Sequence, residues 1–127
     1  MDSKGWVKLH RKLNDHWLWD CNEEFDKRSA WIDILMMVNH KPNKFLLGNE
    51  LVVVDTGEMI TSERKLAERW NWSRTRVRNF LELLEKDHMI AVEKTTKRTT
   101  LKVLNYGAYQ GSENHEKTTK EPQKYLY

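Results

Sequence analysis

The sequence of 127 residues has a single cysteine, Cys21, only two prolines, and no long run of apolar residues. One cysteine cannot form an internal disulfide, so we expect a reducing compartment, the cytoplasm. The first five residues lack the apolar stretch that a secretory signal needs. No segment approaches the roughly 18 consecutive apolar residues of a transmembrane helix, so no membrane partner is expected.

Sequence motifs for catalysis are also missing. There is no glycine-rich phosphate loop, no nucleophile elbow and no paired-carboxylate motif. The five histidines are scattered, and they do not form a compact set of metal ligands with Cys21. The sequence therefore predicts a protein that is not an enzyme and that binds no metal or other cofactor.

What the chain has instead is a local concentration of positive charge. The whole chain carries 22 Lys and Arg against 19 Asp and Glu, which gives a net charge of +3. Residues 62–105 hold eleven of the basic residues but only six of the acidic ones, so the remainder is net acidic. A basic segment of this kind indicates an anionic partner at that part of the molecule.

Hydrophobic spacing predicts mixed elements in the N-terminal half. A short helix is expected within residues 10–18. Apolar residues then repeat at i, i+3, i+4 and i+7, which predicts an amphipathic helix that begins at Lys27 after the N-cap Asp26. These apolar residues are Trp31, Ile34, Leu35 and Val38. Residues 45–54 predict two extended segments around a tight turn, and residues 58–61 predict a further strand.

Two helices separated by three residues are expected next. Ser62 is the predicted N-cap of the first helix, which turns Leu66, Ala67 and Trp70 inward. Ser73 is the predicted N-cap of the second helix, over about residues 74–87. Its apolar face consists of Val77, Phe80, Leu81 and Leu84. Two helices joined in this way predict a helix-turn-helix.

A two-stranded hairpin is expected directly after the second helix. Its strands are predicted at residues 89–94 and 98–104, and residues 95–97 join them. A hairpin in this position is the wing of a winged helix-turn-helix. The predicted fold class is therefore α+β. We expect an N-terminal helical extension at residues 1–26, a winged helix-turn-helix domain at 27–110, and a flexible polar tail at 111–127.

The second helix carries its charges in an order that disfavours it in isolation. Arg74, Arg76 and Arg78 crowd its beginning, where the helix dipole already supplies partial positive charge. Its acidic residues lie towards its end. A helix that starts in this way becomes favourable when a phosphate group binds there.

The expected partner is double-stranded DNA, with the exposed N-terminal half of this helix in the major groove. We assign Arg78 and Asn79 to base edges, because Arg pairs with guanine and Asn with adenine. Basic residues of the hairpin are expected at phosphates or in the minor groove. The full predicted DNA-binding set is Ser62, Arg64, Lys65, Ser73, Arg74, Thr75, Arg76, Arg78, Asn79, Lys94, Lys97 and Arg98.

Plainer explanations exist for the same residues. Arg78 can pair with Glu82 one helical turn away and leave a solvated charged face. Lysines in a hairpin can simply protect exposed strand edges. Trp17 and Trp19 are expected to pack against the helix that carries Trp31, although an aromatic-rich extension can also form a homodimer surface.

Several runs of residues resemble the N-terminal winged-helix region of phage and prophage replication proteins. These replisome organisers are related in fold to the N-terminal domain of primosomal DnaD-type proteins. The resemblance covers most of residues 5–110. It rests on the segments Gly5-Trp6-Val7-Lys8-Leu9-His10-Arg11-Lys12, Gly57-Glu58-Met59-Ile60-Thr61-Ser62, Lys65-Leu66-Ala67-Glu68-Arg69-Trp70, Trp72-Ser73, Val77-Arg78, Phe80-Leu81, Leu84-Glu85-Lys86-Asp87 and Asn105-Tyr106-Gly107-Ala108-Tyr109-Gln110.

The resemblance implies a function in DNA replication initiation, through origin binding or primosome assembly, with helicase-loading or other replication proteins as partners. The sequence departs from the family pattern at His88, where a glycine is usual. Glycine there suits a left-handed residue at the end of a helix. Two alternatives stay open: a transcription regulator on the same fold, and a winged-helix module for protein interaction or oligomerisation.

Overall fold

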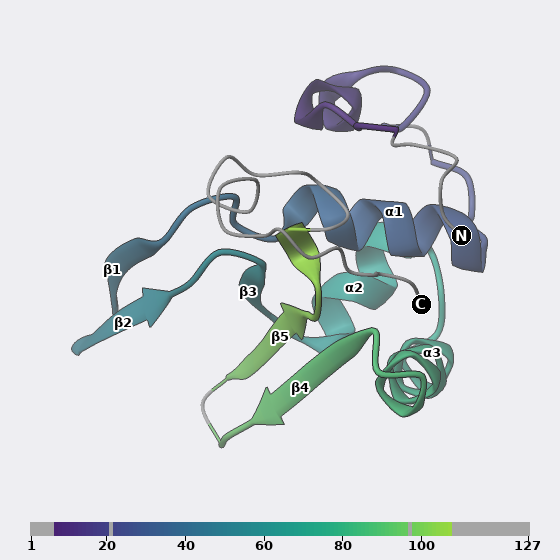
Figure 1. The fold of residues 1–127 in the computed structure, drawn as a ribbon. Coiled ribbons are helices and arrows are strands. Elements are labelled where there is room, and N and C mark those ends of the chain that lie inside the picture. The colour runs from purple at the N-terminus through teal and green to yellow at the C-terminus, as the bar shows by residue number, and fades with distance from the viewer. Residues whose placement is uncertain (1–6, 21, 97, 108–127) are drawn as a thin grey trace.

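The computed structural model describes residues 7–20, 22–96 and 98–107 of the chain. Within these residues the chain forms one 3-10 helix, three α-helices and five strands, which build two small antiparallel sheets. The fold is therefore α+β, as predicted. Figure 1 shows the helices gathered beside the larger sheet, with the β1–β2 hairpin extending away from them. Cys21, Lys97 and the predicted tail at 111–127 lie outside the described residues.

The N-terminal segment forms a shorter helix than the sequence predicts. It contains the 3-10 helix η1 (Arg11–Asp15), which lies over α1 (Figure 1). Arg11 fastens this segment to the body: its Nε and Nη2 donate hydrogen bonds to the carbonyl oxygens of Met36 and Val38 at 2.9 and 2.8 Å. The same guanidinium donates to the hydroxyl of Tyr106. Arg11 thus satisfies carbonyl groups that the end of α1 leaves without helical partners.

Helix α1 (Lys27–Met37) begins where its predicted cap places it. The Asp26 carboxylate accepts a hydrogen bond from the Ser29 N–H at 2.8 Å, and this bond lowers the pKa of Asp26. Ile34 and Leu35 are buried, and Trp31 is partly buried against the core. The prediction of a helix that begins at Lys27 after Asp26 is confirmed. The prediction that it is amphipathic is wrong, because residues 29–37 are all buried or partly buried and leave no solvent-exposed face.

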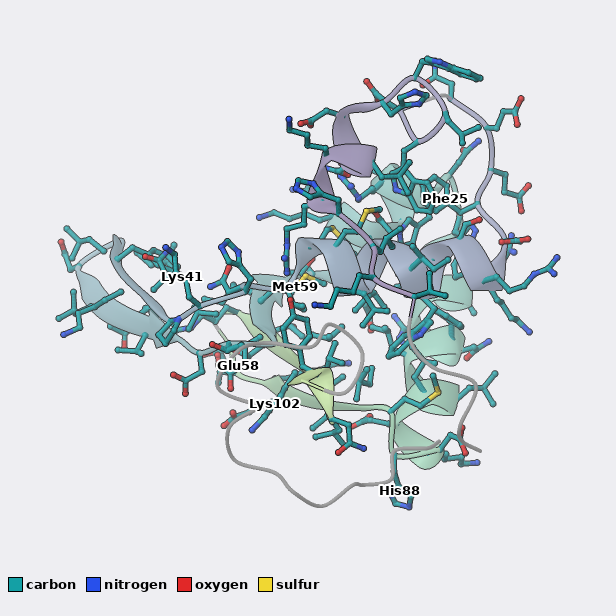
Figure 2. The ribbon with its side chains drawn as sticks, turned by 45° about the horizontal axis from the view of Figure 1, so that its top comes forward. Phe25, Lys41, Glu58, Met59, His88 and Lys102 are labelled. Carbon is teal, nitrogen blue, oxygen red and sulfur yellow. The ribbon has the colours of Figure 1, made fainter. Side chains whose placement is uncertain are left out.

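The strands form two separate antiparallel sheets. β1 (Asn43–Leu47) pairs with β2 (Glu50–Val54), and Gly48, with φ +65°, makes the tight turn between them. β3 (Glu58–Thr61) pairs with β5 (Thr99–Val103), which pairs with β4 (Ile90–Lys94), so the order is β3-β5-β4. Figure 2 shows Glu58 and Lys102, which face each other in the β3–β5 register. The predicted strands are confirmed, with β4 and β5 slightly shorter than expected.

Helices α2 (Glu63–Trp70) and α3 (Arg74–Lys86) close the core together with α1 and the three-stranded sheet. The two helices bury the faces that the sequence predicts. Their buried residues are Leu66, Ala67, Trp70, Val77, Phe80, Leu81 and Leu84. From the sheet, Met59, Ile90, Leu101 and Val103 pack in the same cluster.

Helix α3 ends at a left-handed residue that is not glycine. His88 has a φ of 58°, and Figure 2 shows its side chain pointing away from the molecule. The Met89 N–H donates to the Leu84 carbonyl at 2.9 Å, and the His88 N–H donates to the Glu85 carbonyl at 3.0 Å. These two bonds form the Schellman motif that closes helices at such a residue.

Candidate nucleic-acid interface

The joint between α2 and α3 is fixed by caps on both sides. Ser62 Oγ accepts a hydrogen bond from the Lys65 N–H at 3.1 Å, and Ser73 Oγ accepts one from the Arg76 N–H at 3.1 Å. Asn71 has a left-handed φ of 61°, a conformation that Asn tolerates better than most residues and that ends α2. Three residues therefore suffice to turn the chain from α2 into α3.

Aromatic rings fill this joint. The Trp72 ring meets the rings of Trp70 and Phe80 edge-on, with centroids 4.9 and 5.3 Å apart. Trp72 Nε1–H donates to the Phe25 carbonyl at 2.7 Å, and the Phe25 N–H donates to the Trp70 carbonyl at 3.0 Å. Because the ring between the helices is packed and hydrogen-bonded, the direction of α3 relative to α2 is held firmly.

The predicted recognition face of α3 lies at the surface. Arg74, Thr75, Arg78 and Asn79 are exposed, whereas the opposite side of the helix is buried in the core. The first turn of α3 contains no acidic residue. Ser73, Thr75, Arg76 and Asn79 also line an open hollow of about 400 Å³ beside the start of the helix. The structure thus brings together the six residues predicted on this helix and its cap.

Arg76 lies at the edge of this face and is held from two sides. Its guanidinium carbon is 4.0 Å from the centre of the Trp72 ring, within the range of a cation–π contact. The guanidinium also forms an ion pair with Glu24, which lies in the segment before α1. The side chain stays partly exposed, so Arg76 borders the recognition face without extending freely from it.

Arg78 and Lys94 meet at a single carboxylate, that of Glu63. Arg78 donates to Glu63 through Nε at 3.2 Å and Nη2 at 2.9 Å, and Lys94 Nζ donates to it at 3.2 Å. These bonds, that of Arg78 foremost, lower the pKa of Glu63, and the same contact raises the pKa of Arg78. Arg78 therefore pairs with Glu63 of α2 rather than with Glu82 of its own helix.

The remaining predicted residues divide between two places. Arg98 forms an ion pair with Glu50 of β2 at 3.1 Å, so it links the β4–β5 hairpin to the β1–β2 hairpin. Arg64 and Lys65 are exposed on α2. Lys65 lies about 200° around the helix from Glu63, and it lines a separate hollow of about 1020 Å³. The structure does not bring Lys65 to the exposed face of α3.

Sequence reasoning missed the acidic partners of the arginines. The most buried of them is Asp33 in α1, whose carboxylate accepts hydrogen bonds from Arg69 at 2.6 and 2.9 Å. Nε1–H groups of Trp19 and Trp70 donate to it at 2.9 and 2.8 Å. Arg69, one of the eleven basic residues of segment 62–105, is therefore structural. The signal available in the sequence was Asp33 itself, the lone acidic residue among the apolar residues of this helix.

The N-terminal tryptophans differ in their environment. Trp19 packs edge-on against Phe25, with ring centroids 5.3 Å apart, in addition to its bond with Asp33. Trp17 is exposed. The expected packing of this pair against the body thus holds for Trp19 and not for Trp17, which leaves one ring at the surface.

Other kinds of site were sought in the described part of the chain. Among residues 7–20, 22–96 and 98–107, no three His, Cys, Asp or Glu side chains are grouped so that they could hold a metal ion. None of the helices in these ranges is long and apolar enough to cross a membrane. Comparison of the chain with protein-family models, with curated proteins and with solved structures found no match.

Proposed function

We propose that this chain is a winged helix-turn-helix protein that binds double-stranded DNA. In this proposal the N-terminal half of α3 enters the major groove, and the β4–β5 hairpin is the wing. The order of elements supports it, because α2, a three-residue turn and α3 are followed directly by a hairpin that pairs with β3. The resemblance to phage and prophage replication proteins suggests a role in replication initiation, and a transcription regulator is the alternative on the same fold.

The observation that carries the proposal is the exposed cationic start of α3 beside Lys94 of the hairpin. Within this group four cations face three carboxylates, so positive charge is in excess. The cations are Arg74, Arg76, Arg78 and Lys94, and the carboxylates are Glu24, Glu63 and Glu82. The Arg76–Glu24 ion pair is exposed on both sides, and such pairs are weak, about 0–1 kcal/mol each, so phosphate groups can compete for the Arg76 guanidinium.

Titration of fluorescently labelled duplex DNA tests this function. The variant Arg74→Gln, Arg76→Gln, Arg78→Gln replaces each guanidinium with an uncharged amide. It also removes the contact of the Arg76 guanidinium with Trp72, so its melting temperature is measured to show that it folds. We expect its affinity for duplex DNA to fall at least about tenfold. A matched control removes three cations from the N-terminal segment and from near the β1–β2 hairpin: Lys8→Gln, Lys12→Gln, Lys41→Gln. Equal affinity of both triple variants would contradict the proposal.

A second candidate function, a module for protein interaction or oligomerisation, is favoured by one observation. On the β1–β2 hairpin Leu46 faces Leu51 across the strands, and their exposed fractions are 69% and 64%. Val53, on the same face of the hairpin, is also exposed. An apolar face on a projecting two-stranded hairpin is typical of an interaction surface.

The oligomeric state separates this second candidate from the first. Under it, sedimentation equilibrium shows a concentration-dependent dimer that the change Leu46→Ser, Leu51→Ser abolishes. DNA affinity is then the same for the wild type and the triple arginine variant. A wild-type monomer throughout the micromolar range would contradict self-association through this hairpin.

A further inference from the structure

Glu63 holds together three elements of the candidate interface. It is the first residue of α2, and it contacts Arg78 of α3 and Lys94 at the end of β4. Its own side chain is only 12% exposed, whereas that of Arg78 is 46% exposed. The carboxylate is therefore fixed in the protein, while the guanidinium that it holds still reaches the surface.

The geometry of the contact decides which edge of Arg78 remains for a ligand. A guanidinium group has five N–H donors in one plane. Glu63 takes the edge formed by Nε and Nη2, through Oε2 and Oε1 respectively. The other edge, formed by Nη1 and the second hydrogen of Nη2, is not used by Glu63. This edge again offers two parallel N–H groups, the arrangement that binds O6 and N7 of guanine.

We infer that Glu63 is a positioning residue that fixes Arg78 for recognition of a guanine base. This inference rests on the proposed DNA-binding function and adds a residue to it. An arginine on a solvated helix face loses the freedom of its rotamers when it binds a base. Arg78 has already lost much of this freedom in the bidentate contact. Lys94 binds the same carboxylate, so the β4–β5 hairpin is held in a fixed position relative to α3.

The negative charge of Glu63 allows an experiment to distinguish a gain in sequence discrimination from a gain in overall affinity for DNA. A carboxylate next to a DNA interface repels phosphate groups, so it lowers the affinity for every sequence. Its benefit appears only where Arg78 meets the correct base. Glu63→Gln should therefore bind mixed-sequence DNA at least as tightly as the wild type, and it should distinguish sequences less well.

The experiment starts with selection of duplexes by the wild-type protein from a randomised pool. Affinity is then measured for the preferred duplex and for duplexes in which each selected G·C pair is replaced. The ratio of interest is the affinity for the preferred duplex divided by that for the duplex in which the G·C pair read by Arg78 is replaced. We expect this ratio to fall about fivefold in Glu63→Gln. Glu82→Gln is the matched control, because Glu82 acts on Arg78 through charge alone. It should strengthen binding to all duplexes alike.

A second variant shows whether Glu63 acts through Arg78. Arg78→Lys keeps the positive charge but has no bidentate edge, so it should lose discrimination at the same base pair. In the double variant Glu63→Gln, Arg78→Lys, this affinity ratio should then be the same as in Arg78→Lys alone. If the role of Glu63 is purely structural, Glu63→Gln should change the affinity ratio by the same factor in the wild type and in Arg78→Lys. Melting temperatures of all variants show that each one folds.

The outcomes separate this inference from the proposed function. If the wild type binds no duplex, the DNA-binding function itself is wrong. If it binds duplex DNA only as well as the triple arginine variant does, the placement of the interface on α3 is wrong. If the wild type selects a sequence through Arg78 and Glu63→Gln discriminates as well as the wild type, only the positioning role is overturned.

Discussion

The guanidinium of Arg69 in α2 donates two hydrogen bonds, at 2.6 and 2.9 Å, to the fully buried carboxylate of Asp33 in α1. The indole N–H groups of Trp19 and Trp70 donate two further hydrogen bonds to the same carboxylate. The contact joins the N-terminal segment, α1 and α2 in one polar cluster inside an apolar core.

Removal of Arg69 leaves a buried negative charge without its cation. We expect Arg69→Met to lower the free energy of unfolding by about 3–5 kcal/mol, as measured by urea denaturation. Arg28→Met is the control, since Arg28 and Asp26 are 90% and 55% exposed and their ion pair should contribute little. A loss below about 1 kcal/mol for Arg69→Met would show that water or another group compensates Asp33.

A gain in stability is expected at the end of α3. His88 has a φ of 58°, which costs a residue with a Cβ atom more than it costs glycine. His88→Gly should therefore raise the free energy of unfolding by about 0.5–1 kcal/mol and raise the melting temperature. His40→Gly, in the exposed loop after α1, should lower both quantities. An unchanged or lower melting temperature for His88→Gly would contradict the assigned strain.

Caps and helical periods made these elements predictable from the sequence alone. Asp26, Ser62 and Ser73 each lie within three residues of the N–H group that they cap, so a local pattern identifies them. The left-handed position of His88 was expected from the resemblance, because the replication-protein family usually has glycine there. Local chemistry therefore accounted for the order and type of the elements.

The partners of the charged residues could not be predicted in this way. Arg78 and Glu63 are 15 positions apart, Arg69 and Asp33 are 36, and Arg76 and Glu24 are 52. Such pairs form only after the helices pack, and many other acidic residues satisfy the same sequence criteria. The near neighbour Glu82 was the natural local choice for Arg78, and the tertiary fold offers the better-placed Glu63 instead.

Glu63 also links stability to pH. Its hydrogen bond with Arg78 lowers its pKa below the usual value of 4.5, so the unfolded chain binds a proton more readily than the folded one. The stabilisation is present above pH 4.5 and is lost as pH falls towards the lower folded-state pKa. Urea unfolding between pH 7 and 3 should show the stability difference between wild type and Glu63→Gln shrinking with falling pH. A constant difference would contradict this linkage.

Two glycines with left-handed φ angles should respond differently to substitution. A Cβ atom on Gly57 would lie 3.0 Å from Cβ of Tyr106, whereas one on Gly48 would have no neighbour within 4 Å. Gly48→Ala carries only backbone strain, about 1 kcal/mol, and Gly57→Ala adds a clash with a buried tyrosine. Thermal unfolding should show the larger loss for Gly57→Ala. Equal losses would mean that Tyr106 moves aside freely.

The dependence of DNA binding on salt tests the central claim most directly, because it reports how many cations of the protein meet phosphate groups. For the wild type, the logarithm of the binding constant should fall linearly with the logarithm of salt concentration, by about 0.9 for each phosphate contacted. For the triple variant at Arg74, Arg76 and Arg78, the slope should be shallower by about two phosphate contacts, because Arg74 and Arg76 are assigned to the DNA backbone and Arg78 to a base edge. The triple lysine control should keep the wild-type slope. An identical slope for wild type and arginine variant would contradict the account, because it would show that the start of α3 does not meet the DNA backbone.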